Sequence, residues 1–159
     1  MAEVKSSFVD GKAPEREVIW NDWLKALAVL KQLVGDVPAA WLSGSFLTSK
    51  QVPGDIDSLF IIDAVEYASA KARLSPEYLP ILTALAGGNA AREVLGLNVD
   101  SYILEWDPKP TPAANSRDGY YLSRGYWDDL WVRVKDPNDS RLESIPRRGY
   151  LEVIIDGYK

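Results

Sequence analysis

Two aspartates separated by a single residue, Asp55 and Asp57, open an apolar segment with the sequence DIDSLFII. Side chains alternate between the faces of a strand, so both carboxylates are expected on the same side, where two acids at this spacing can share divalent cations. Upstream, Gly44 and Ser45 leave the chain with little side-chain bulk, so backbone N–H groups there can approach a phosphate closely. Residues 41–62 therefore predict a phosphate site beside a metal-binding acidic pair.

A third acid lies in a later segment, LNVDSYILEW, which predicts a strand over residues 97–106. Alternation along this strand directs Asp100 to the same face as Tyr102. Lys50 is a candidate for neutralising a phosphate. Each signal also has a simpler interpretation: Gly-Ser as an ordinary turn, Asp55 as the cap of a Pro-Gly-Asp turn, and Asp100 as a solvent-facing acid on an edge strand. Asp57 is less easily explained by a purely structural role, because burying a carboxylate beside an apolar run costs free energy unless the carboxylate has a partner.

The composition narrows the possible chemistry. The 159-residue chain contains no Cys and no His, which removes the usual zinc ligands, disulfides and histidine-based catalysis. Acid–base or metal chemistry must then use carboxylates, which suit Mg²⁺ or Mn²⁺. The net charge of −5 argues against a surface built for nucleic acid, although basic residues are frequent in the last third of the chain. No signal-peptide pattern or membrane-length apolar run is present, so we expect a soluble cytoplasmic protein with no membrane contact.

The remaining patterns predict one domain over residues 1–159, in which a mixed sheet is flanked by helices, an α/β or α+β architecture. Residues 1–13 are expected to be a flexible or loosely docked lead-in. Helices are predicted from Pro14 to Gly35, over residues 64–74, from Ser75 to Gly87, after Asn89, and in part of residues 117–134. Strands are predicted over residues 39–42, 57–62, 97–106 and 149–155, and a Pro-rich surface loop over residues 107–116.

The order of these motifs resembles the DNA polymerase β-type nucleotidyltransferase superfamily. The resemblance is carried by an apolar strand, Gly44-Ser45, a spacer of nine residues, Asp55-Ile56-Asp57, and then Asp100. The segment GSFLTSKQVPGDID is also similar to small stand-alone bacterial and phage domains of this type, and YWDDLW and RGYLEVII are similar to their closing region.

The resemblance implies a metal-dependent enzyme that transfers a nucleoside monophosphate from a nucleoside triphosphate, such as ATP, to an acceptor. In that reaction Asp55, Asp57 and Asp100 would be the catalytic metal ligands for Mg²⁺ or Mn²⁺. Gly44, Ser45 and Lys50 would bind the triphosphate, assisted by a helix that begins near Ser45. The acceptor is left open between a tRNA end, a protein hydroxyl and a small molecule, and a partner protein or a second copy of the chain is compatible with the pattern.

Two other nucleotide-binding classes are excluded by their motifs. SGSFLTSK lacks the Gly-Lys-Ser/Thr ending of a P-loop, and no G-x-G-x-x-G follows a strand. A sugar-nucleotide glycosyltransferase would explain the D-x-D pair but requires a longer chain and leaves Gly-Ser unexplained. The alternative from another class is a non-catalytic nucleotide-binding or protein-interaction module, as one half of a toxin–antitoxin or phage-defence pair.

Overall fold

The computed structural model describes residues 1–108, 119–134 and 147–159. Most of the Pro-rich loop expected over residues 107–116, and the basic positions 117, 135 and 141, lie outside these ranges. The described elements include the helices α1 (Ala2–Phe8), α2 (Pro14–Val34), α3 (Ala64–Arg73), α4 (Leu79–Leu85), α5 (Ala90–Leu95) and α6 (Gly119–Val132), and a short 3₁₀ turn, η1 (Ser45–Leu47). The strands are β1 (Ala39–Ser43), β2 (Ile56–Asp63), β3 (Val99–Trp106) and β4 (Leu151–Ile154).

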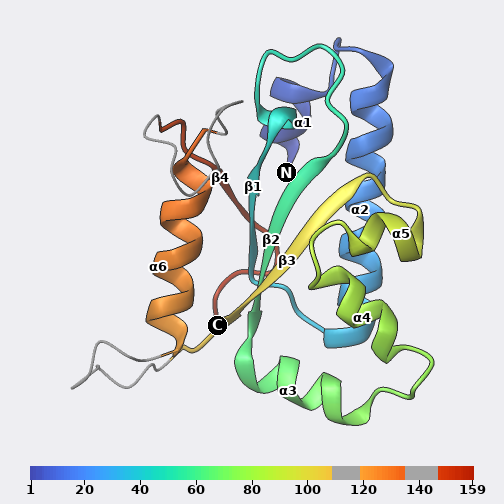
Figure 1. Cartoon of the computed structure of the whole chain (residues 1–159), viewed down its shortest axis with the longest axis vertical. Helices are drawn as coiled ribbons and strands as arrows, with labels where there is room; N and C mark the ends of the chain where they lie inside the picture. Colours follow the sequence, from blue (N-terminus) through green and yellow to red (C-terminus); the bar gives the residue numbers. More distant parts are fainter. Residues whose placement is uncertain (109–118, 135–146) are drawn as a thin grey trace.

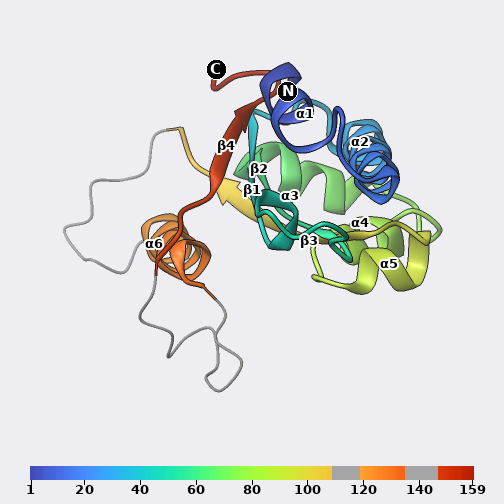
Figure 2. The ribbon, with the colours of Figure 1, turned by 90° about the horizontal axis from the view of Figure 1, so that it is seen from above.

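The strands form one mixed sheet in the order β3-β2-β1-β4. β1 is antiparallel to both β2 and β4, whereas β2 and β3 are parallel. Helix α6 covers one face of the sheet, and α2 to α5 lie on the other side (Figures 1 and 2). The expected architecture, a mixed sheet flanked by helices, is therefore confirmed.

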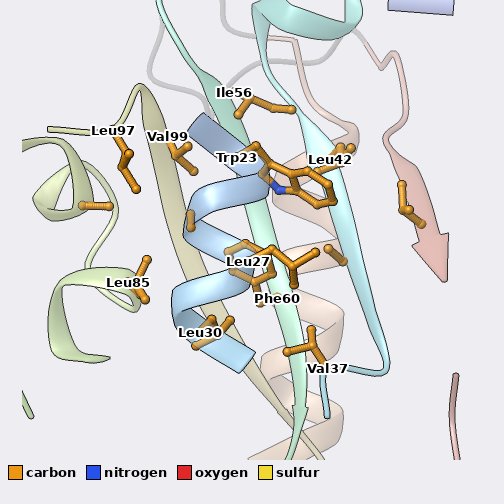
Figure 3. Packing of buried hydrophobic residues seen from close by; sticks show 14 of the residues in the cluster. Trp23, Leu27, Leu30, Val37, Leu42, Ile56, Phe60, Leu85, Leu97 and Val99 are labelled. Carbon is orange, nitrogen blue, oxygen red and sulfur yellow. The ribbon is translucent and has the colours of Figure 1, made fainter. Parts of the chain in front are cut away.

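The inner strand β2 is buried on both faces because its residues are apolar at both odd and even positions. Ile56, Phe60 and Ile62 face the larger core, which they share with α2, whereas Leu59 and Ile61 face α6. Ser58 is the polar exception on the α2 side, where the indole N–H of Trp23 donates a 2.9 Å hydrogen bond to its hydroxyl. Figure 3 shows Trp23, Leu27 and Leu30 of α2 stacked along the strands, beside Phe60.

Two predicted segments differ from the structure. Instead of a loose lead-in, residues Ala2–Phe8 form α1, because Val4 and Val9 are buried in the larger core. The helix expected from Ser75 begins only at Leu79, so that Pro80, and not Pro76, lies in its first turn. None of the helices in the described part of the chain is long and apolar enough to cross a membrane.

Trp23 anchors α2 to the sheet, and its replacement tests this packing. We expect Trp23→Ala to lower the free energy of unfolding by about 3–5 kcal/mol, because it leaves a cavity and an unpaired hydroxyl on Ser58. Val18→Ala in the same helix is the control; Val18 is 54% exposed, so the change should stay within about 0.5 kcal/mol. Urea unfolding of both variants measures the difference, and equal effects would contradict the packing described.

Candidate functional site

Gly44 forms a close contact between the end of β1 and the start of β2. Its φ of 84° and ψ of −174° belong to a region that residues with a side chain rarely adopt. A Cβ atom on Gly44 would lie 2.0 Å from Oδ2 of Asp57 and 3.3 Å from the Asp57 backbone nitrogen. The carboxylate of Asp57 therefore lies directly against the Gly44 backbone, and only glycine fits there.

A row of polar side chains crosses three strands beside this contact. In the strand register, Ser43 pairs with Asp57, and Asp57 pairs with Asp100. Paired residues on neighbouring strands project to the same face, and here that face is the one covered by α6. The next residues on this face are apolar: Trp41, Leu59 and Tyr102 pack around Trp131. We call Ser43, Asp57 and Asp100 the polar row.

Asp100 is the least satisfied member of the polar row. Its Oδ1 atom is buried and has no hydrogen-bond partner among the described residues. Burial raises the pKa of Asp100 above its usual value, the negative charge of Asp55 raises it further, and Arg92 partly opposes both. A carboxyl group held in this way is a frequent feature of functional sites, because ordinary folding does not favour it.

Asp55 lies just before β2, and its partner is a cation. Arg92 of α5 donates a 2.8 Å hydrogen bond to Oδ2 of Asp55 and a 3.3 Å hydrogen bond to the Gly54 carbonyl. Asp55 is near enough to affect the pKa of Asp100, yet its carboxylate is held in an ion pair. In the described ranges, no group of three or more acidic side chains lies close enough together to hold a metal ion.

The predicted phosphate ligands lie in different places. Ser45 follows Gly44, but the expected helix there is only the three-residue turn η1, which is too short to have a helix dipole. The Ser45 carbonyl accepts hydrogen bonds from the hydroxyl and the backbone N–H of Thr48, which closes the turn. Lys50 is exposed and lines a separate cavity; none of the three aspartates is among the described residues of its wall.

Two residues at this site, Ser43 and Arg148, were not singled out individually from the sequence. Arg148 donates a 3.2 Å hydrogen bond from Nη2 to the Ser43 hydroxyl, and its backbone N–H bonds to the Val132 carbonyl at the end of α6. Alternation along β1 with Trp41 was the signal that could have placed Ser43 on this face. No local pattern could have placed Arg148, because it lies more than a hundred positions along the chain from Ser43.

The geometry partly fits a divalent cation. Two neighbouring carboxylates, one with an unpaired buried oxygen, are suitable hard ligands. The positive charge of Arg148, which bonds to Ser43 beside Asp57, opposes a bound cation. The third carboxylate, Asp55, would have to exchange Arg92 for the cation.

Residues 1–154 match a family that is described as a family of unknown function (DUF6932). The chain belongs to this family. No curated protein and no solved structure matches the chain. For this member of the DUF6932 family, the polar row is therefore the feature that indicates a possible reaction.

The contact between Gly44 and Asp57 predicts an unusual pattern of substitution effects. Gly44→Ala should destabilise the protein more than Gly35→Ala, which has a similar φ of 90° but open space around its Cβ position. Gly35→Ala should cost about 1–3 kcal/mol from backbone strain alone. In a double-mutant cycle measured by urea unfolding, Asp57→Ala should recover at least about 1 kcal/mol of the Gly44→Ala loss. Purely additive effects would show that the contact carries no strain.

The raised pKa of Asp100 predicts a variant that stabilises the fold. The folded state holds the Asp100 proton more tightly than the unfolded state, whose pKa is about 3.8, so the ionised carboxylate destabilises the fold at neutral pH. Asp100→Asn should therefore be more stable than the wild type at pH 7. This advantage should shrink as the pH falls through the folded pKa towards 3.8.

Asp156 is the control with the opposite sign. The Lys31 ammonium and the Val37 N–H lower the pKa of Asp156, so Asp156→Asn should be less stable than the wild type at pH 7. This loss should disappear as the pH falls below about 3.8 and through the folded pKa. Denaturant unfolding at several pH values measures both variants. If Asp100→Asn were less stable than the wild type at pH 7, the raised pKa of Asp100 in the folded state would be contradicted.

Proposed function

We propose that this protein is a metal-dependent nucleotidyltransferase that moves a nucleoside monophosphate from a nucleoside triphosphate to the oxygen of a hydroxyl-bearing acceptor, with cleavage of the bond between the α- and β-phosphates and release of pyrophosphate. The observation that carries the proposal is the polar row, in which Asp57 and Asp100 are register partners and the carboxylate of Asp57 lies against the Gly44 backbone. This reaction needs acidic side chains close to the turn that contacts the triphosphate, and the sequence resemblance to polymerase β-type nucleotidyltransferases has the same elements in the same order.

Each residue has a separate role in this proposal. Asp57 and Asp100 would hold Mg²⁺ or Mn²⁺, joined by Asp55 once that residue releases Arg92. The bound cation would supply charge stabilisation at the phosphoryl oxygens. Gly44 and Ser45 would bring backbone N–H groups and a hydroxyl to the triphosphate, and Arg148 would add a positive charge. The raised pKa of Asp100 suits it to accept the proton of the acceptor hydroxyl.

The ion pair between Asp55 and Arg92 favours a second candidate, a non-catalytic nucleotide-binding or protein-interaction module. An arginine that permanently occupies the first acid of the D-x-D pair would leave too few ligands for a catalytic cation. The two candidates therefore differ in whether a nucleotide and a metal displace Arg92.

A transfer assay distinguishes the nucleotidyltransferase from the non-catalytic module. The protein is incubated with each α-³²P-labelled nucleoside triphosphate, Mg²⁺ or Mn²⁺, and a cell extract fractionated into RNA, protein and small molecules. Label should pass to one fraction, and Asp57→Asn and Asp100→Asn should each reduce transfer by about 100-fold or more, as expected for groups that stabilise charge in the transition state. The labelled fraction identifies the class of acceptor.

Asp63→Asn is the matched control for this assay. Asp63 is on the same strand as Asp57, but it caps α3 by accepting from the N–H groups of Val65 and Glu66, and asparagine caps equally well. Its transfer rate should be unchanged. Undiminished transfer in Asp57→Asn would overturn the proposed site. Triphosphate binding without transfer, in both the wild type and Arg92→Gln, would favour the non-catalytic module.

A further inference from the structure

A polar cavity lies on the opposite side of the sheet from the polar row. It has a volume of about 540 Å³, which is within the range of small-molecule sites. Its walls come from α1 and the turn after it, from the start of α2, and from the segment that follows η1. The residues that matter for its chemistry are Ser7, Lys12, Arg16, Thr48, Ser49 and Lys50.

Arg16 is the buried charge in this wall, with only 3% of its surface exposed. Nη1 of its guanidinium donates to the carbonyls of Phe8, at 3.0 Å, and Phe46, at 2.7 Å. Nη2 donates to the carbonyls of Thr48, at 2.8 Å, and Lys50, at 2.5 Å. These four acceptors are neutral, so the hydrogen bonds satisfy the donors but do not cancel the positive charge.

No carboxylate compensates this charge in the described structure. Burial lowers the pKa of Arg16, and no nearby carboxylate among the described residues raises this pKa again. None of the described residues in the wall is acidic, whereas Lys12 and Lys50 add two more cations. The nearby Asp10 is already paired with Lys5. An uncompensated buried cation is costly, and an anion bound in the cavity would offset that cost.

A purely structural role for Arg16 explains only part of this arrangement. Four carbonyl contacts are enough to join α1, α2 and residues 46–50. They do not explain why two lysines and no described acid surround the same cavity, in a chain with a net charge of −5. The α2 N-terminus, at Ala13 and Pro14, also lies at this wall, but Glu15 and Glu17 in its first turn offset its partial positive charge.

We propose that this cavity binds a small molecule through a phosphate group, which lies between Lys12 and Lys50 in the field of Arg16. A phosphate matches the wall better than a carboxylate, because it offers three or more oxygens to the two ammonium groups and to the hydroxyls of Ser7 and Ser49. The site is separate from the polar row and does not depend on the proposed transfer reaction. It also assigns a role to Lys50, which lines this cavity.

Thermal unfolding and calorimetry with three probes test the proposal: inorganic phosphate, pyrophosphate and adenosine monophosphate. Ionic strength is held constant with sodium chloride, and EDTA removes the metal that binding at the polar row would need. Each bound probe should raise Tm saturably. Similar affinities for all three probes would indicate recognition of the phosphate alone, whereas tighter binding of the monophosphate would indicate a phosphorylated organic ligand.

Lysine variants inside and outside the cavity decide the result. The double variant Lys12→Gln/Lys50→Gln should raise the Kd for phosphate by about tenfold or more, because each lysine supplies a charge-assisted contact. Lys71→Gln removes one exposed charge in α3, where Lys71 pairs with Glu105, and should leave Kd unchanged. Asp57→Asn should also leave it unchanged, which separates this site from the polar row. Absence of a saturable Tm shift, or an equal Kd in the double variant, would overturn the proposal.

Discussion

Burial of β2 on both faces is the constraint on which the rest of the structure depends. A strand enclosed by α2 on one side and by α6 on the other can carry charge only where it enters and leaves the sheet. The two acids of β2, Asp57 and Asp63, occupy those two ends. Asp63 is used to cap α3, so Asp57 is the acid of this strand that remains for chemistry.

Two arginines from distant parts of the chain contact the candidate site. Arg148 approaches the polar row from the segment before β4, whereas Arg92 approaches Asp55 from α5. Arg92 belongs to the helices on the α2 side, so it reaches around the entry of β2 and not across the sheet. The acidic residues are therefore bordered by cations on two sides, an arrangement suited to a ligand that carries its own negative charge.

Much of this architecture follows from sequence pattern, and the exceptions have physical reasons. The apolar run of residues 59–62, after Asp57 and Ser58, indicated a buried strand, and alternation placed Asp100 on the face of Tyr102; both expectations are confirmed. The parallel register that makes Asp57 and Asp100 neighbours depends on how the chain crosses between β2 and β3, which no local pattern specifies. Helix α1 was missed because a short helix with one buried valine has almost no periodic signal. The Arg92 ion pair and the Arg148 contact join residues far apart in sequence, beyond the reach of motif spacing.

The hydrogen bonds of Arg16 also connect parts of the chain that are distant in sequence. Its partners are separated from it in sequence by 8, 30, 32 and 34 positions, so one side chain closes several loops at once. The guanidinium of Arg16 bonds to the last residue of helix α1 and to three residues of the segment 46–50. Loss of the guanidinium from its place exposes all of these carbonyls together. We therefore expect the N-terminal helix and the segment after the Gly44 turn to open together, although more than thirty residues of sequence separate them.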